Sequence, residues 1–363
     1  MRIVVDVAPL SHQRTGVGNY VRGSLLGLAE AGAGEHTVVA FAPVSARGRR
    51  EVESALAGIE LERRLPVVPL AHAVRTVWSR AGTPPAERLL GGFDVLHFSD
   101  WMYPPQRSGV RSTMVHDLVP IRFPEWVHPR TRRMHGAKYR HAARTCDVVI
   151  VNSRFTGADV ADTLGVPAER IHVAYPGVEA GFDPEGDRLD LGRPYALTVA
   201  TLEPRKNLAA LLEAHRLPGS GGLALAVAGA AGWGRQPALD APDIVRLGYT
   251  PAPELPRLYR GAAVFVYPSL FEGFGMPVVE AMACGVPCVV SSHPSLDEAC
   301  GDAAVRADPT DPSALAAAIE RALAERDALV ALGLAHARRF TWLENGRAHL
   351  AAWEAARLTS PST

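Results

Sequence analysis

Short apolar runs alternate with amphipathic segments along most of the chain. The runs are almost continuous in hydrophobic residues, as in parallel strands that are buried on both faces. Examples are residues 2–7, 37–41, 93–98, 112–115 and 147–151. Helices are predicted between them, most clearly at residues 20–31, 71–80, 129–145 and 153–164. This alternation predicts an α/β protein built on parallel sheets.

A stretch rich in proline, glycine and charge, residues 182–194, divides the chain into two strand–helix series. We predict one domain over residues 1–182, a second over residues 190–342, and a C-terminal helix and tail over residues 343–363. The pattern is weak between residues 47 and 92. A helix at residues 52–57 and a short strand at residues 67–68 are expected there.

Composition narrows the class of protein. Lys plus Arg and Asp plus Glu both number 38, so the formal net charge is zero, which argues against nucleic acid as the main partner. No apolar run is long enough to span a membrane, and the N-terminus lacks a signal-peptide pattern. The four cysteines include no C-x-x-C pair, which favours free thiols in a reducing cytoplasm and no metal site.

The most informative stretch is residues 264–291. A short strand leads into a loop containing Gly273 and Gly275, and a helix is predicted to begin at Pro277 and to stop at Gly285. The amides of Phe274, Gly275 and Met276 fall at the helix start, where an anion is favoured.

This stretch contains two carboxylates, Glu272 and Glu280. A carboxylate can accept two hydroxyl hydrogen bonds. A nucleotide diphosphate joined to a sugar would satisfy both the helix start and the carboxylates. The alternative is a solvated Glu272 and a Glu280 that only interacts with the helix dipole.

Arg205 and Lys206 lie between a predicted strand, residues 195–200, and the helix that follows. Two cations at a helix N-terminus oppose the dipole there, and a bound anion would relieve the conflict. The planar guanidinium and the ammonium together suit a diphosphate. The alternative is a solvated pair with Glu203 as its partner.

The run from Glu272 to Pro287, EGFGMPVVEAMACGVP, resembles the E-x7-E signature of the retaining glycosyltransferases of family four. The resemblance implies the GT-B fold, in which two Rossmann-like domains face each other across a central cleft and a C-terminal helix crosses back to the first domain. It places Arg205 and Lys206 on the donor diphosphate, Glu280 on the ribose, and Glu272 on the sugar. It also places the nucleotide base near Tyr249 and Leu255.

The resemblance assigns the N-terminal half to the acceptor, but Gly16 and Gly18 are expected to bind the donor from a loop that lines the cleft. The alternative is that these glycines only turn the chain. A nicotinamide site is disfavoured because Val21 occupies the third glycine position of the dinucleotide motif.

His116 and Asp117 end a predicted strand, and the resemblance implies that the histidine lies beside the hydroxymethyl end of the transferred sugar. Trp101 and Tyr103 follow another strand end, where they could stack on an acceptor or simply pack the loop.

These observations predict a metal-independent, cofactor-free hexosyltransferase, with His116, Glu272, Arg205 and Lys206 as its catalytic residues. The N-terminal half resembles the mannosyltransferase-like subset, so GDP-mannose is the expected donor. A glycan, lipid-linked or natural-product hydroxyl is the expected acceptor. The alternatives are a UDP- or dTDP-sugar donor, or a non-catalytic module that binds sugar nucleotides.

The basic helix over residues 130–144 is either solvated or a face for anionic lipid. We therefore expect a cytoplasmic protein that could bind peripherally to the inner face of the membrane.

Overall fold

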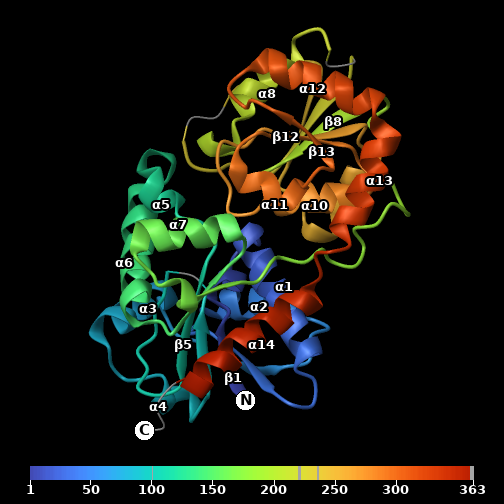
Figure 1. Ribbon diagram of the computed structural model, residues 1–363. Coiled ribbons are helices and arrows are strands. Elements are labelled where there is room, and N and C mark those ends of the chain that lie inside the picture. The colour runs from blue at the N-terminus through green and yellow to red at the C-terminus, as the bar shows by residue number, and fades with distance from the viewer. Residues whose placement is uncertain (100, 220–221, 235–236, 360–363) are drawn as a thin grey trace. The chain divides into compact units, whose positions relative to one another are not determined.

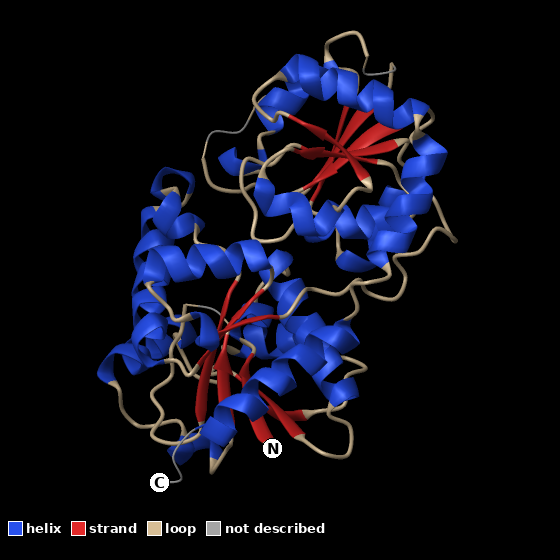
Figure 2. Cartoon of the chain, in the orientation of Figure 1, coloured by secondary structure: helices blue, strands red, loops and turns tan. Residues whose placement is uncertain are grey.

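The computed structural model describes residues 1–99, 101–219, 222–234 and 237–359, and it divides into two α/β units (Figure 1). The first unit comprises Met1–Ile121, Pro129–Gly177 and Thr341–Thr363, and the second comprises Arg122–His128 and Val178–Phe340. Each unit has one parallel sheet with helices on both of its faces (Figure 2). The predicted α/β class is therefore confirmed. The last four residues of the expected tail lie outside the described residues.

The first sheet has the strand order β3-β2-β1-β4-β5-β6-β7. Its strands are β1 (Arg2–Asp6), β2 (Thr37–Phe41), β3 (Glu62–Arg64), β4 (Val95–Phe98), β5 (Val110–Val115), β6 (Val148–Val151) and β7 (Ile171–Val173). Its helices are α1 (Gly16–Ala31), α2 (Ala46–Ala55), α3 (Ala71–Ala81), α4 (Glu87–Leu90), α5 (Val119–Arg122), α6 (Pro129–Thr145), α7 (Arg154–Leu164) and α14 (Trp342–Thr359).

The second sheet has the order β10-β9-β8-β11-β12-β13. Its strands are β8 (Tyr195–Val199), β9 (Ala224–Ala228), β10 (Ile244–Gly248), β11 (Val264–Tyr267), β12 (Cys288–Ser291) and β13 (Ala304–Ala307). Its helices are α8 (Leu208–His215), α9 (Leu255–Gly261), α10 (Met276–Ala283), α11 (Asp297–Cys300), α12 (Pro312–Ala324) and α13 (Arg326–Ala337).

Both sheets contain a point at which the strand order reverses. In the first sheet this point lies between β1 and β4, and in the second it lies between β8 and β11. Loops that leave the carboxyl ends of such neighbouring strands diverge, and open α/β sheets bind their ligands in the crevice that results. A ligand-binding site is therefore expected at the loops after β8 and β11.

The predicted C-terminal helix is confirmed as α14, and it packs on α1 of the first unit. The two backbones come so close that only glycine fits. A Cβ added at Gly27 would lie 1.8 Å from the carbonyl oxygen of Trp342, and one added at Gly346 would lie 2.2 Å from the carbonyl oxygen of Gly27. The Asn345 side chain donates a hydrogen bond of 2.7 Å to the carbonyl of Tyr175.

The structure changes three local predictions. The strand expected at residues 67–68 is instead β3, because Pro66 and Pro69 flank those valines and proline cannot donate to a ladder. Val67 keeps only an isolated bridge to Val44. The first helix begins at Gly16 rather than at Tyr20, so Gly16 and Gly18 lie in its first turn and not in a loop. The helix expected at residues 52–57 is α2, which begins at Ala46, where the Ser45 side chain caps it.

The close approach of α1 and α14 yields a stability prediction. Gly27→Ala should lower the free energy of unfolding by about 2–3 kcal/mol, because the new methyl group overlaps backbone that cannot move far. Urea unfolding followed by circular dichroism measures it. Gly16→Ala is the matched control, since it lies in the same helix with no atom within 4 Å of the added Cβ. The control should be neutral or slightly stabilising. Equal stability of the two variants would contradict the packing argument.

Candidate active site

The loop after β8 carries Arg205 and Lys206 in a short 3-10 turn, Pro204–Lys206. Asn207 ends this turn with a φ of 55°, in the left-handed region that asparagine tolerates better than most residues. Its side-chain amide donates to the carbonyls of Pro268, at 3.2 Å, and Pro309, at 2.6 Å. Asn207 thus ties the loop after β8 to the loop after β11.

Glu272 stands in the loop after β11 and is 6% exposed. Its carboxylate accepts from the Arg205 guanidinium at 2.9 Å and from the Lys206 ammonium at 2.5 Å. Arg205 also donates to Glu203 at 3.0 Å, and Lys206 donates to the hydroxyl of Tyr267 at 2.7 Å. The structure therefore brings together three of the residues that the sequence singled out, although 66 residues separate Lys206 from Glu272.

These contacts settle the ionisation of Glu272. Burial alone would raise the pKa of its carboxyl, but attraction to Lys206 and Arg205 outweighs burial and lowers the pKa to about 2. Burial and the neighbouring Arg205 cation lower the pKa of Lys206, and Glu272 opposes that change. At neutral pH the carboxylate of Glu272 is ionised and its two oxygens are held by cations.

Glu280 lies on α10, which begins directly after Gly275. Gly275 has a φ of 106°, and a Cβ there would lie 2.5 Å from the Leu296 side chain, so the turn requires glycine. The carboxylate of Glu280 accepts from the Tyr259 hydroxyl at 2.9 Å. Burial raises the pKa of Glu280 to about 7, and the nearby Glu179 acts in the same direction. The carboxyl is therefore poised to exchange a proton near neutral pH.

Four more of the residues predicted to bind the donor occupy the same unit, whereas Gly16 and Gly18 lie on α1 of the first unit. The Phe274 ring packs edge-on against Phe340, and Met276 is the first residue of α10. Tyr249 is 37% exposed in the turn after β10, whereas the Leu255 side chain is buried at the start of α9.

His116 and Asp117 follow β5 in the first unit. The His116 ring meets Tyr20 edge-on at a centroid distance of 5.0 Å, and its Nε2 has no hydrogen-bond partner within the described part of the chain. Burial lowers the pKa of His116 to about 3, with Lys138 and His135 adding to the effect. The imidazole is therefore neutral at physiological pH.

The remaining first-unit candidates contact the protein itself. The carboxylate of Asp117 accepts from the amide of Val119 at 3.0 Å. Trp101 is buried, with the His72 ring 4.6 Å away, and Tyr103 stacks on His141 at 4.4 Å. For Trp101 and Tyr103, packing within the loop is one of the two alternatives that the sequence left open, and the acceptor role of all three residues stays a prediction.

Several residues that complete the site were not singled out from the sequence. Tyr267 and Tyr259 hydrogen-bond to Lys206 and Glu280, and the Ser295 hydroxyl accepts from the amide of Glu272 at 3.0 Å. Ser295 follows β12, the strand beside β11. The rule that ligands gather at adjoining strand ends could have pointed to it.

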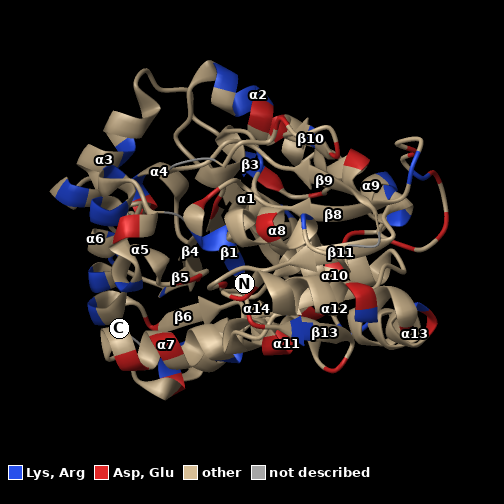
Figure 3. Ribbon diagram, turned by 90° about the horizontal axis from the view of Figure 1, so that it is seen from above, with Lys and Arg blue, Asp and Glu red and all other residues tan. Residues whose placement is uncertain are grey.

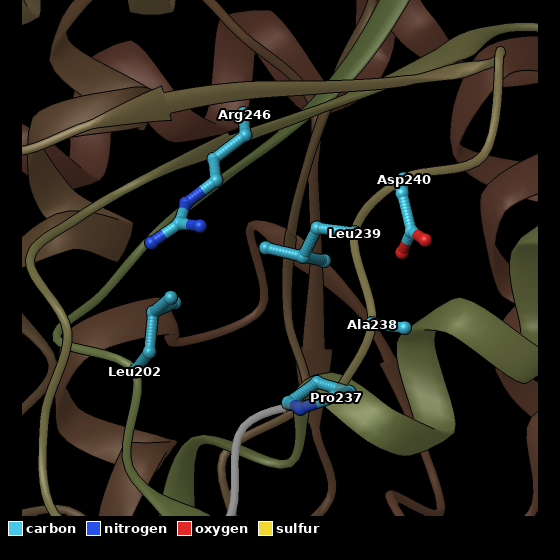
Figure 4. A pocket seen from close by; sticks show the side chains of 6 residues that line it. All are labelled: Leu202, Pro237, Ala238, Leu239, Asp240 and Arg246. Carbon is cyan, nitrogen blue, oxygen red and sulfur yellow. The ribbon is translucent and has the colours of Figure 1, made fainter.

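A cavity of about 360 Å³ lies beside the loop after β8 (Figure 4). Its lining joins apolar side chains to one cation and one anion, and consists of Leu202, Pro237, Ala238, Leu239, Asp240 and Arg246. None of these residues belongs to the ion cluster of Arg205, Lys206 and Glu272, although Leu202 directly precedes Glu203. In the described residues no group of three or more His, Cys, Asp or Glu side chains could hold a metal ion.

Two family models match the chain. Residues 14–182 match Glycosyltransferase Family 4, and residues 182–339 match Glycosyl transferases group 1. O-antigen chain mannosyltransferase B of Escherichia coli is 34% identical over 69% of this chain and 71% of its own length. Two other relatives are longer, and the chain spans 52% of one and 32% of the other.

Solved structures show the same fold. Sucrose-phosphate synthase from Thermosynechococcus elongatus aligns with a TM-score of 0.71 and 19% identity, covering 99% of this chain and all of that one. Anabaena Alr3699/HepE in complex with UDP-glucose aligns with a TM-score of 0.68 and 16% identity, covering 98% of this chain and all of that one. The predicted GT-B fold and enzyme class are confirmed, and the chain belongs to the family 4 glycosyltransferases.

Proposed function

We propose that this glycosyltransferase moves a hexose from a nucleotide-diphosphate sugar to an acceptor hydroxyl, with retention of configuration and without a metal ion. The observation that carries the proposal is the buried cluster of Arg205, Lys206 and Glu272 at the strand-order reversal of the second sheet. A diphosphate leaving group gains negative charge as its bond to the sugar breaks. Two cations that are fixed on Glu272, in the loop that leads into α10, suit that charge.

In the proposed reaction, the bond between the anomeric carbon and the diphosphate oxygen breaks. The acceptor oxygen then bonds to that carbon from the same face, and its proton passes to the departing phosphate. Arg205 and Lys206 stabilise the leaving group, Glu280 accepts from the ribose hydroxyls, and Glu272 accepts from the sugar hydroxyls. The half-buried, neutral His116 would hydrogen-bond to the hydroxymethyl end of the sugar.

For the donor, we propose GDP-mannose. The similarity to O-antigen chain mannosyltransferase B supports mannose and a glycan acceptor. The Anabaena structure in complex with UDP-glucose supports the alternative of a UDP-sugar. We also propose a cytoplasmic location, which the four free and buried cysteines support.

The nucleotide can be identified by mass action. Thermal melting should be recorded with GDP, UDP and dTDP, each with and without EDTA. The cognate nucleotide, at about 100 times its Kd, should stabilise the protein by about 2.7 kcal/mol and raise the melting temperature irrespective of EDTA. We expect that nucleotide to be GDP.

Arg205→Ala should abolish the shift, whereas Arg321→Ala, an exposed arginine on α12, should keep it. A shift with UDP or dTDP alone would replace the mannosyl assignment, and the absence of any shift would refute the donor site.

Removing a member of the ion cluster should slow transfer. Arg205→Ala, Lys206→Ala and Glu272→Ala should each lower kcat by about 10²-fold or more, because each removes or misplaces an electrostatic stabiliser. The rate of nucleotide release from the sugar nucleotide measures it, and circular dichroism verifies folding.

Because the three side chains share contacts, the double variant Lys206→Ala/Glu272→Ala should lose less than the product of the single losses. Near-wild-type rates in all three single variants would refute this assignment.

A substitution that removes the charge of Glu280 should raise the stability of the protein and weaken nucleotide binding. Its carboxyl has a folded pKa of about 7 against an ordinary 4.5, so the folded state holds its proton more tightly. That contribution to stability is fully present below about pH 4.5 and is lost as the pH rises through about 7. Glu280→Gln does not titrate and should exceed the wild type by roughly 3 kcal/mol at pH 8.

The same variant should bind the cognate nucleotide about tenfold more weakly, since an amide oxygen is a poorer acceptor than a carboxylate. Urea unfolding at pH 5 and pH 8 and nucleotide titration test the two halves. A stability difference that does not grow with pH would contradict the assigned burial of the carboxyl.

A further inference from the structure

Helix α6 carries one cation that lies inside the first unit. The Lys and Arg residues of this helix appear in blue in Figure 3, and Arg133, Arg140 and Arg144 are exposed. Lys138, in contrast, is only 2% exposed. No described helix, α6 included, is long and apolar enough to cross a membrane. A solvated face and a lipid-binding face both require cations on the surface, so neither alternative for α6 explains Lys138.

Lys138 and its neighbour Tyr139 fix the backbone on both sides of His116. The Lys138 ammonium donates to the carbonyl of Met114 in β5. The Tyr139 hydroxyl donates to the carbonyl of Asp117 at 2.9 Å. Only one residue besides His116 lies between the two carbonyls. The backbone of His116 therefore cannot shift without taking a carbonyl away from a buried donor of the same helix.

Helix α1 contacts the imidazole from another element. The ring of Tyr20 meets the His116 ring edge-on at a centroid distance of 5.0 Å, and the Tyr20 hydroxyl is itself fixed on the carbonyl of Ala174 at 2.8 Å. The backbone of His116 is thus held from α6 and its ring is contacted from α1. Its Nε2, which has no hydrogen-bond partner within the described part of the chain, stays available to a group from outside the protein.

Charge adds to this arrangement. The titratable side chains near His116 come from several elements and are Lys138 and His135 of α6, Tyr20 of α1, His97 of β4 and Asp117 of its own loop. Burial lowers the pKa of His116 most, followed by Lys138 and then His135. A neutral side chain at position 138 would neither donate to the Met114 carbonyl nor repel a proton from the imidazole.

We propose that Lys138 and Tyr139 are positioning residues, which act on sugar transfer through His116 and without contacting the substrates. This assignment rests on the proposed function, because His116 matters for transfer only if it meets the sugar. The precision is needed because a misplacement of about 1 Å in a group that contacts substrate can cost about 10²-fold in rate. The buried face of a basic helix thus serves the site, although neither residue lies in a sequence motif.

Double variants test whether the two residues act through His116. Lys138→Met keeps a long side chain but removes its charge, and it should lower kcat about tenfold or more. Tyr139→Phe should lower kcat about fivefold. In the background of His116→Ala, each change should cost less than about twofold further, because there is no imidazole left to position. Losses that persist in full in that background, or wild-type kcat in both single variants, would overturn the proposal.

The pH dependence of transfer separates the two residues. Without the Lys138 cation the pKa of His116 should rise, so in Lys138→Met the fall of kcat/KM toward low pH should begin at a higher pH than in the wild type. Tyr139→Phe removes no charge and should keep the wild-type profile. The control Arg140→Met removes an exposed cation of the same helix and should keep both the profile and kcat. An unchanged profile in Lys138→Met would overturn the role assigned to Lys138.

The imidazole signals of His116 in nuclear magnetic resonance spectra give a readout that does not depend on turnover. With isotope-labelled histidine, these signals are identified by their loss in His116→Ala. They should move in Lys138→Met and Tyr139→Phe and stay in place in Arg140→Met. Unmoved signals in the first two variants would overturn the proposal. Moved signals together with full transfer by His116→Ala would support the positioning and refute instead the catalytic role of His116 in the proposed function.

Discussion

The buried pairing of Glu272 with Arg205 and Lys206 is the interaction on which the site of the second unit depends. A carboxylate that is 6% exposed is costly to ionise unless cations hold it, and breaking such a buried pair typically costs about 3–5 kcal/mol. The pairing joins the loop after β8 to the loop after β11, so the fold and the site share it. Asn207 reinforces the joint through backbone carbonyls rather than through charge.

The arrangement also shows which groups neutralise the two cations before the start of α8. The sequence led us to expect that the conflict between Arg205, Lys206 and the helix dipole needed an outside partner. The structure supplies Glu272, and Glu203 beside it, as internal partners. On the proposed function, a donor diphosphate would compete with Glu272 for the two cations. The carboxylate would then be released to accept from sugar hydroxyls, and the cations would already be in position.

Much of this could be predicted from local sequence. The nearly continuous apolar runs predicted the parallel strands, and the spacing of glycine, proline and glutamate predicted the turn and helix that carry Glu272 and Glu280. The contact between Lys206 and Glu272 could not be predicted, because it depends on strands β8 and β11 lying side by side across a large sequence separation. At residues 67–68 the flanking prolines prevented a strand despite the strand propensity of the two valines. At Gly16 and Gly18 the sequence suggested a loop, but α1 already begins at Gly16.

The ion cluster of the second unit and His116 of the first unit use burial in opposite ways, and the proposed chemistry gives a reason for the difference. In the cluster of Glu272, Arg205 and Lys206 the charges are paired, so on the proposed function the two cations can face a leaving group that becomes negative. In the first unit, burial holds His116 neutral, with a pKa of about 3. A cationic imidazole would repel a sugar whose anomeric carbon becomes positive as the bond breaks, whereas a neutral imidazole can exchange hydrogen bonds with a hydroxyl at no electrostatic cost. Burial without a counter-ion would destabilise a charged residue. For His116 it keeps the imidazole neutral, and a neutral imidazole suits the proposed role.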